Sequence, residues 1–509
     1  MCKVKHSGTF CANIRLIINC KFERILLTMK NLLAFLALVL ILVSCGGNKD
    51  NRAINEYLSA FLKDNKKVIA FGKLNVNSVL DKAGYKQIPK LGVVADNYLK
   101  ELNASINIET PVYFALEGPL SEDGTPETAY AFFEVVNADS LVDKITQQGF
   151  DPEIDGDLRY ISSGDVAIGV KNNLCVLISK KGEYDAKKML KESFEKVKDD
   201  VSEGKVDDIL QEEGELVLGV SMENMYLTSN TELAELPKEK KEKVQEMVKD
   251  SYLLSTLKFE KGLTIFESKN LFSSALNEKM FLKEDGSAAI VSKLGTGNPT
   301  IGLSMNMDMK KLQGFLEEYS PNTLKDLGEN AGGAASFLLA SGGEDALSNL
   351  FSGEIGAVMV GAPNAYEGLS DFNFFVGLGK QGKMMADQAK MFLSLGMAEV
   401  NVDSKGLSAF SNKDFAPSAG KRLAIPKGCA DFGKKGITAF VNLEGVDLST
   451  FEFENEQKII YLIKNITFEM DNAGSRLVIT AKDGSENMLK QSVDLMVEEL
   501  ADKISALTL

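Results

Sequence analysis

The sequence predicts an α+β protein built from two tandem, diverged copies of a mixed or antiparallel sheet with helices packed on one face. Similar segments recur in the same order at an offset of about 210 to 240 residues, which indicates an internal duplication. Within each half, stretches of period-two hydrophobicity alternate with amphipathic helical stretches, and hairpin turns make part of each sheet antiparallel. We therefore expect residues 65–290 to form the first α+β repeat and residues 291–509 the second.

Five pairs of segments carry the duplication. The first pair, 68–82 and 300–314, has the pattern of a strand followed by a helix, with Asn77 and Asp308 as the expected helix caps. The other pairs are 111–119 with 355–363, 129–145 with 371–389, 214–227 with 435–448, and 257–268 with 466–481. The phenylalanines that we expect at equivalent core positions are Phe132-Phe133 with Phe374-Phe375, and Phe259 with Phe468.

The amino terminus has the pattern of a bacterial lipoprotein signal. Residues 32–43 are consecutive apolar residues, and this run is shorter than the roughly 18 residues that a membrane span needs. Lys30 precedes the run, and Leu42-Val43-Ser44-Cys45 after it resembles the lipobox, in which the cysteine receives the lipid. We therefore expect a signal peptide at 29–44 and lipid attachment at Cys45. An ordinary secretory signal with a chance cysteine is the alternative.

The start of the chain also bears on where the protein resides. Met29 begins a compact signal, so residues 1–28 are expected to be an over-extended gene start, although translation from Met1 stays open. Residues 45–64 are then the lipidated cysteine, a tether and a lead-in helix. Because Gly46 rather than Asp follows the cysteine, we predict a lipid anchor in the outer membrane, with the surface-exposed side favoured over the periplasmic side.

Charge and composition exclude several classes of function. The chain carries 57 Lys or Arg and 72 Asp or Glu, a formal net charge of -15, and removal of residues 1–44 makes this balance about -20. Such a surface repels phosphate backbones, so we expect no nucleic-acid partner, and the body should stand off from an anionic membrane. The one histidine is His6, and tryptophan is absent. Histidine-based triads and His-ligated zinc sites are therefore excluded from the expected mature chain.

One stretch resembles a nucleotide site. Residues 377–382, GLGKQG, match the fingerprint G-x-G-x-x-G between an expected strand and an expected helix. The matching turn of the first copy, residues 135–140, reads VVNADS, so the same turn forms there without glycine. An exported protein would also meet little NAD. We therefore predict no nucleotide cofactor.

Two further motifs resemble metal sites. Residues 151–157, DPEIDGD, resemble the start of a calcium loop, but the twelfth position, where an EF-hand needs Glu, is Ser162. Residues 305–309, MNMDM, alternate thioethers in a pattern that suits Cu(I). The first copy has Leu74 and Val76 at the matching places, so core packing is the preferred interpretation. We predict no bound metal.

The sequence signals for a catalytic nucleophile or a catalytic acid are equally weak. Residues 255–258, STLK, have S-x-x-K spacing but lie in a strand-like stretch without companion motifs. Cys175 lies in an apolar strand-like run; export permits a disulfide between it and Cys429, but one distant pair is weak evidence, and the pairing stays open. The many acidic residues keep a carboxylate-pair hydrolase possible, although nothing singles a pair out.

The lipobox, the segment VIAFGKLNVNSVLDKAG at 68–84 and the total length together resemble a family of uncharacterised lipoproteins from anaerobic Gram-negative bacteria, catalogued as a domain of unknown function. The resemblance covers nearly all of the expected mature chain. It implies an α+β lipoprotein, and it supplies no active-site residues.

These observations lead to a functional expectation. We expect a non-enzymatic envelope lipoprotein that binds a partner or ligand or scaffolds an assembly, held at the membrane by the lipid on Cys45. The partner would be an unknown envelope protein or glycan, and the oligomeric state stays open. The alternative is a carboxylate-dependent hydrolase of glycan or cell-wall polymer. A cleft lined by Asp and Glu with raised pKa values would favour the enzyme, and a broad apolar patch would favour binding.

Overall fold

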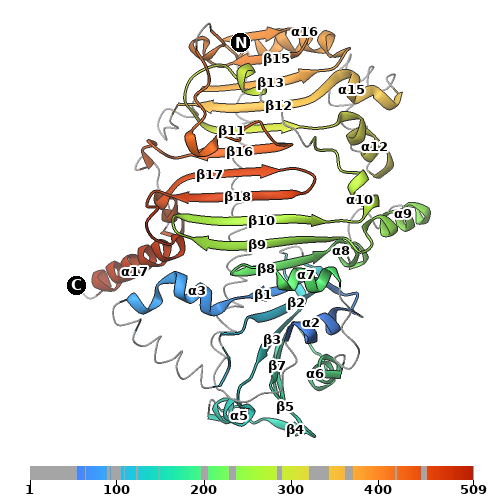
Figure 1. The fold of residues 1–509 in the computed structure, drawn as a ribbon, viewed down its shortest axis with the longest axis vertical. Helices are drawn as coiled ribbons and strands as arrows, with labels where there is room; N and C mark the ends of the chain where they lie inside the picture. Colours follow the sequence, from blue (N-terminus) through green and yellow to red (C-terminus); the bar gives the residue numbers. More distant parts are fainter. Residues whose placement is uncertain are drawn as a thin grey trace, which may run out of the picture. The chain divides into compact units, whose positions relative to one another are not determined.

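The computed structural model describes residues 54–63, 65–88, 92, 105–107, 109–121, 124–147, 149–195, 204–228, 237–283, 289–319, 343–361, 371–418, 421–448 and 455–507 (Figure 1). The predicted gene start, the signal peptide and Cys45 lie outside these residues. Among the described residues, no helix is long and apolar enough to cross a membrane. The structure combines helices with extended antiparallel strand ladders, so the predicted α+β class is confirmed.

The chain divides into two compact units. Unit 1 comprises Met1–Asn77, Val93–Asp207 and Asn224–Thr231, and unit 2 comprises Ser78–Gly92, Asp208–Glu223 and Glu232–Leu509. The chain crosses between the units five times. Three of these crossings fall within helices, which are α3 (Val76–Ala83), α7 (Lys205–Gln211) and α8 (Met222–Thr228).

Unit 1 contains an antiparallel sheet. Its strands pair in the order β1 (Val68–Leu74), β2 (Val112–Leu120), β3 (Pro126–Glu134), β7 (Leu174–Lys180), β6 (Val166–Lys171), β5 (Leu158–Ser163) and β4 (Glu153–Asp155). Its further helices are α2 (Ile54–Lys63), α5 (Ala138–Gln147) and α6 (Ala186–Glu195). Phe61 of α2 packs its ring 4.9 Å from that of Tyr130 and 5.3 Å from that of Phe132, which joins α2 to β3. These rings form part of the core because aromatic side chains bury large apolar areas.

Unit 2 contains a longer antiparallel sheet. Its strands pair in the order β8 (Leu216–Ser221), β9 (Tyr252–Glu260), β10 (Leu263–Leu271), β18 (Gly474–Ala481), β17 (Ile463–Met470), β16 (Ile437–Asn442), β11 (Pro299–Asn306), β12 (Phe351–Val360), β13 (Asp371–Leu378), β15 (Gly406–Phe410) and β14 (Glu399–Val402). Figure 1 shows these strands side by side in that order. The pairing of β10 with β18 joins strands about 210 residues apart in the sequence.

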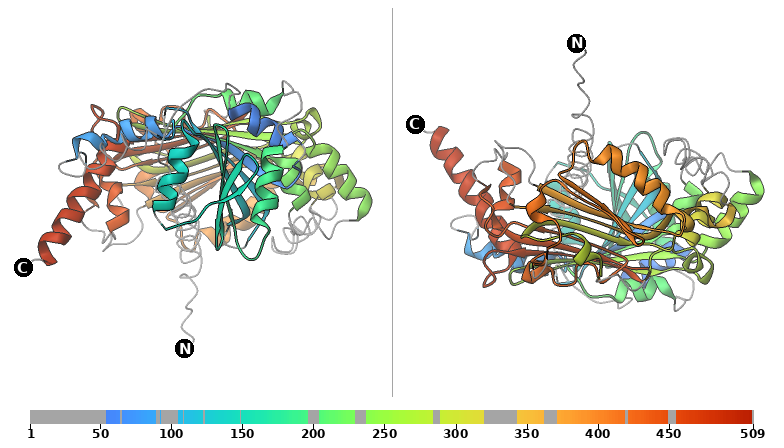
Figure 2. Two further views of the ribbon diagram at one scale, coloured as in Figure 1. Left: turned by 90° about the horizontal axis from the view of Figure 1, so that it is seen from below. Right: turned by 90° about the horizontal axis from the view of Figure 1, so that it is seen from above.

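Unit 2 also contains helices and short helical turns. They are the helices α9 (Lys238–Val248), α10 (Ser274–Glu278), α11 (Ala289–Lys293), α12 (Met309–Tyr319), α15 (Ala346–Leu350), α16 (Gly382–Leu393) and α17 (Met488–Leu507), with the 3-10 turns η1 (Tyr85–Gln87), η4 (Gly343–Asp345), η5 (Lys413–Phe415), η6 (Lys427–Cys429) and η8 (Asn455–Leu462). Seen from above in Figure 2, α16 lies along the strands at its end of the sheet.

The helices of unit 2 cover both faces of its sheet, which corrects the expectation of one covered face. Phe375 of β13 belongs to a core cluster with Ile290 of α11, whereas its neighbour Phe374 packs into a cluster with Ala386 of α16. Adjacent residues of a strand point to opposite faces. The two helices therefore lie on opposite sides of β13, because each has an apolar side to bury.

One of the two expected helix caps is also corrected. Asp308 caps α12, since its carboxylate accepts hydrogen bonds from the amides of Lys310 and Lys311 at 3.1 and 3.0 Å. Asn77, in contrast, lies inside α3, and its side chain donates to the carboxylate of Glu109. The cause is the length of the connection, because one residue links β1 to α3 and two link β11 to α12.

The compact units cut across the predicted repeats. Strands β8, β9 and β10 belong to the predicted first repeat, 65–290, yet they lie in the same sheet as the strands of 291–509. The reason is the β10–β18 ladder, in which residues 263–269 pair with 474–480. A boundary placed by sequence similarity does not follow strand pairing of this kind.

Candidate functional site

A continuous row of apolar side chains crosses the sheet of unit 2. Residues directly opposite each other in neighbouring strands lie on the same face, so the ladder registers define the row. From β8 to β15 it consists of Leu216, Leu257, Phe266, Leu477, Phe468, Ala439, Leu303, Ala357, Phe374 and Ala409. The edge strand β14 extends the row, because its Val400 lies opposite Ala409.

Two parallel rows on the same face continue this pattern, and we call the three rows together the apolar face. From β9 to β13 the second row is Phe259, Thr264, Ile479, Ile466, Val441, Ile301, Met359 and Phe372. From β8 to β15 the third row is Leu218, Ser255, Ser268, Ser475, Met470, Ile437, Met305, Ile355, Val376 and Leu407.

Part of the apolar face is accessible. Phe266, Ile301, Leu303 and Phe372 are between 36% and 44% exposed, although large apolar side chains usually gain about 1.5–3 kcal/mol from full burial. Two parts of the face are covered, one near the β15 end and one over the middle strands β17 and β18. The cluster of Ala386 of α16 packs on Phe374 and Leu378, and a cluster containing Met488 of α17 packs on Ile466 and Ile479. The exposed side chains therefore lie beside these two covered parts, Phe266 on β10 and Ile301, Leu303 and Phe372 on β11 and β13.

The few polar groups on the apolar face are hydroxyls. The Oγ atoms of Ser255 and Ser268 on β9 and β10 hydrogen-bond to each other at 2.9 Å. Thr264 and Ser475 are the other polar members, and no position of the three rows is Asp, Glu, Lys, Arg, Tyr or Trp. A surface of this composition offers dispersion contacts and desolvation, and no charge for a charged ligand to pair with.

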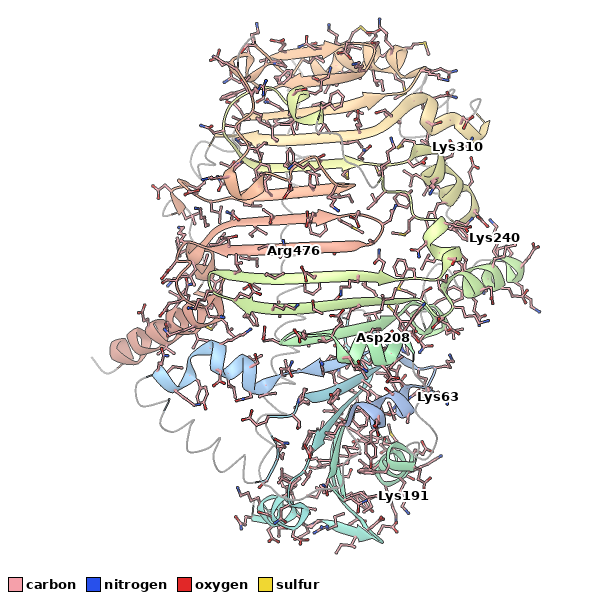
Figure 3. The ribbon with its side chains drawn as sticks, in the orientation of Figure 1. Lys63, Lys191, Asp208, Lys240, Lys310 and Arg476 are labelled. Atoms are coloured by element: carbon pink, nitrogen blue, oxygen red, sulfur yellow. The ribbon has the colours of Figure 1, made fainter. Side chains whose placement is uncertain are left out.

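The opposite face of the same strands is polar. The residues next to the central row form a second row, from β8 to β15: Val217, Thr256, Glu267, Arg476, Glu469, Thr438, Ser304, Gly356, Phe375 and Ser408. Figure 3 labels Arg476 on β18, between β17 and β10. Its Nε lies 2.8 Å from Oε1 of Glu267. We call this side the polar face.

A pocket of about 270 Å³ lies on the polar face. Thr438, Thr467, Thr480 and Arg476 line its floor, and Cys429 of η6 lines its wall. Asp431, another lining residue, pairs with Lys434 at 2.8 Å. Of the two acidic residues that line this pocket, Asp431 and Glu469, Asp431 is thus paired with a basic neighbour.

The perturbed carboxyl groups of the described residues have lowered pKa values. Burial alone would raise the pKa of Glu215, but hydrogen bonds from Lys82, the Phe259 amide and Ser78 outweigh it and lower the pKa. Hydrogen bonds from Lys187 and Lys191 lower the pKa of Asp155 to about 2. A general acid needs a raised pKa, so these carboxylates do not supply one.

The glycines of GLGKQG serve packing rather than phosphate binding. The turn lies directly against residues 348–352, where a Cβ on Gly379 would come within 2.3 Å of a backbone oxygen and one on Gly382 within 2.2 Å. The amides of Gly379 and Gln381 donate to the carbonyls of residues 350 and 349 at 3.0 and 2.8 Å. Backbone amides in a dinucleotide turn must face the pyrophosphate, and here the protein's own backbone takes that place.

The residues of the metal-like and nucleophile-like motifs interact with other parts of the protein as well. Asp155 of the calcium-like stretch pairs with Lys187 and Lys191 at 2.5 and 2.7 Å. Met305 lies on β11 whereas Met309 begins α12, so the three thioethers do not share one strand. Ser255 bonds a serine of the next strand rather than Lys258. Over the described ranges, no group of three or more His, Cys, Asp or Glu could hold a metal ion.

Both cysteines beyond the amino terminus are buried free thiols. Cys175 lies in β7 of unit 1, and Cys429 lies in η6 of unit 2. Burial raises the pKa of both, that of Cys429 to about 11. They are therefore protonated thiols at neutral pH and do not form the disulfide that the sequence left open. Cys45, the expected lipidation site, lies outside the described residues.

The similarity of this chain to known proteins is low. No protein-family model matches the chain, and no curated protein matches it. The chain is similar to two solved structures, crystal forms I and IV of TP0453, each at 10% identity. The similarity covers 44% and 42% of this chain and 80% and 78% of those chains, with a TM-score of 0.26 in both cases. A similarity of this size carries no argument about fold or function.

Sequence reasoning missed the apolar face, although a signal was present. In β11 the large residues Ile301, Leu303 and Met305 alternate with Gly302 and Ser304. A half-buried strand usually buries its large apolar residues. The structure buries the small residues instead and exposes the large ones.

Proposed function

We propose that the protein is a non-enzymatic envelope lipoprotein that binds acyl chains on its apolar face. The observation that carries the proposal is the central row, in which ten opposed side chains from Leu216 to Ala409 are all apolar. Four side chains of the face are at least one-third exposed. Contiguous exposed apolar surface of this kind is typical of an interaction site.

The chemistry of the face favours acyl chains over a protein partner. The cores of protein interfaces are enriched in Tyr, Trp, Phe, Met and Arg and carry about one hydrogen bond per 100–200 Å². The three rows contain Phe and Met but no Tyr, Trp or Arg, so they offer few hydrogen-bonding groups, and two of their hydroxyls are already paired with each other. An acyl chain needs only dispersion contacts and exclusion of water.

We further propose that the lipid on Cys45 anchors the protein in the outer membrane, with the surface-exposed side favoured. Support comes from the sequence: the short apolar run 32–43, the lipobox and Gly46 after the cysteine. Growth with an alkyne fatty acid should label the wild type, while the Cys45→Ser variant should remain an unlabelled precursor. Undiminished labelling of that variant would contradict the anchor. Protease treatment of intact cells tests the membrane side.

The internal duplication remains part of the proposal, along with the resemblance to the family of unknown function. In unit 1 the strands pair in the order β1, β2, β3, β7 and β6, and in unit 2 the order β11, β12, β13, β15 and β14 repeats this arrangement. In both series a helix follows the first strand and another follows the third. The meanders β8-β9-β10 and β16-β17-β18 form a second matching pair.

Displacement of a fluorescent polyene fatty acid tests acyl-chain binding. We expect the wild-type chain to bind the probe and the Leu303→Glu variant to bind it about tenfold or more weakly, because a charge would have to be buried with the chain. The matched control is Ile154→Glu, which changes an exposed aliphatic residue of another strand. Equal weakening by both variants, or no binding by the wild type, would contradict the proposal.

A further inference from the structure

Helix α16 carries an apolar stripe that the fold does not bury. Met384, Met391, Phe392 and Leu395 are between 51% and 86% exposed. At 100° per residue they fall within an arc of about 100° on one side of the helix and its C-terminal turn. The stripe is therefore one continuous outward surface.

The opposite side of α16 already supplies the packing that holds the helix. Ala386 is buried in a cluster with Val400, Leu407 and Ala409, and Ala389 and Leu393 pack against the same cluster. A globular surface helix normally has one apolar side facing the core and a polar side facing water. Here the outward side is apolar as well, so the outward stripe does not stabilise the sheet.

Lysines lie along one side of the stripe. Lys380, Lys383 and Lys390 are exposed, and among the described residues none of the three has a salt-bridge partner within 4.0 Å. Asp387 is the one acidic residue of α16. In a chain with a net charge of -15, this helix is a local positive region beside an apolar crest. The stand-off from membranes that the net charge predicts thus does not hold at this helix.

We propose that α16 docks on the surface of a phospholipid bilayer. The stripe would lie among the acyl chains near the headgroups, and the lysines would reach the phosphates, since long basic side chains extend toward the interface. A second copy of the chain fits less well. In a two-fold pair the same surface meets itself, which would bring the lysines of two helices together. This contact is separate from the acyl-chain site on the apolar face and does not depend on it.

The absence of tryptophan from the sequence makes a site-specific test possible. In the full chain mixed with phosphatidylcholine vesicles containing some phosphatidylglycerol, the Phe392→Trp variant has one indole on the stripe. We expect its emission to shift to shorter wavelength when vesicles are added and to be quenched by lipids brominated on the acyl chain. The control is Ile154→Trp, which has one indole at an equally exposed position on another element. It should show neither change.

Two further substitutions test whether the change in emission comes from docking of the stripe on the vesicle. Adding Met391→Asp and Leu395→Asp to the Phe392→Trp chain should weaken vesicle binding about tenfold or more, because two apolar side chains are replaced by charges. Circular dichroism of these variants checks that the fold is kept. A blue shift without quenching by brominated lipid would indicate contact between protein chains and would overturn the proposal. Emission that does not change on adding vesicles would also overturn it.

Discussion

The two faces of the unit 2 sheet share the same strands and differ in what they present. On the polar face Glu267, Arg476 and Glu469 stand opposite one another across three strands. One residue along each strand, the apolar face has Phe266, Leu477 and Phe468. Since consecutive side chains alternate between faces, each strand has one polar and one apolar side at this level. At this level neither face is fully buried, since Phe266 is 38% exposed and the Arg476 side chain 44%. The polar face is buried farther along the sheet, where the cluster of Phe375 and Phe440 packs on it.

Small residues explain how the other face is buried. A Cβ on Gly302 would lie 2.3 Å from the ring of Phe440, and one on Gly356 would lie 2.9 Å from Ile290. Aromatic and aliphatic side chains from other elements thus fill the space above the glycines. This face is closed by side chains that pack onto it, whereas the large side chains of the apolar face remain accessible for a ligand.

The largest expected effect contrasts two phenylalanines of β13. Phe375 is 2% exposed in the core cluster of α11, and Phe372 is exposed on the apolar face. We expect Phe375→Ala to lower the free energy of unfolding by about 3–5 kcal/mol, and Phe372→Ala to change it by less than about 1 kcal/mol. Urea unfolding followed by circular dichroism measures both. Similar losses for the two variants would mean that the faces do not differ in burial.

A second contrast uses neighbouring residues of β11. Gly302→Ala should lower the free energy of unfolding by about 1–3 kcal/mol, because the added methyl group clashes with the Phe440 ring. Leu303→Ala, one residue later on the apolar face, should change it by less than about 1 kcal/mol. Thermal or urea unfolding of the two variants measures the difference. A tolerated alanine at Gly302 would argue against close packing on that side.

Acidic pH should lower the stability of the fold and leave ligand binding to the apolar face unchanged. Because the pKa of Glu215 is lowered from 4.5 in the folded chain, this carboxylate contributes stability above its unfolded pKa and loses it as the pH falls through the lowered value. Glu215→Gln should therefore make unfolding less dependent on pH in the acidic range. Binding of an uncharged acyl ester to the apolar face should stay constant from about pH 5 to about pH 8, since the face has no titratable group. A binding step within that range would contradict this composition.

The smallest effect is expected at the exposed ion pair of the polar face. Arg476 and Glu267 are each partly exposed, and solvent screens their attraction. Arg476→Gln should change the free energy of unfolding by about 0.2–1 kcal/mol and leave fatty-acid binding unchanged. A marked loss of fatty-acid binding in this variant would place the ligand on the polar face instead.

Much of the fold could be predicted from the sequence, because hydrophobic period and turn residues are local signals. The strand-helix order at 68–82 and 300–314 is present as β1-α3 and β11-α12. The prediction that Asn77 caps a helix was wrong. Sequence similarity between the two segments does not show that the connection between β1 and α3 is one residue shorter than the connection between β11 and α12. The comparison with VVNADS suggested that the GLGKQG turn needs no glycine, whereas the structure leaves no room for a Cβ at Gly379 or Gly382.

The apolar face could not be predicted for a different reason. Alternation in β11 shows that two faces differ, but not which face is covered. That choice depends on Phe440, which comes from a strand more than a hundred residues away, and on Ile290 of a separate helix. Only the assembled sheet shows that these side chains pack over Gly302 and Gly356 and leave Leu303 accessible.

Photo-crosslinking tests the central claim most directly. A fatty acid with a photoreactive group near the end of its chain is bound to the full-length protein and activated, and the modified peptides are identified by mass spectrometry. The account predicts adducts on apolar-face residues such as Phe266, Leu303 and Phe372, with none on Thr438 or Arg476 of the polar face. Adducts confined to the polar-face pocket, or spread evenly over both faces, would contradict it.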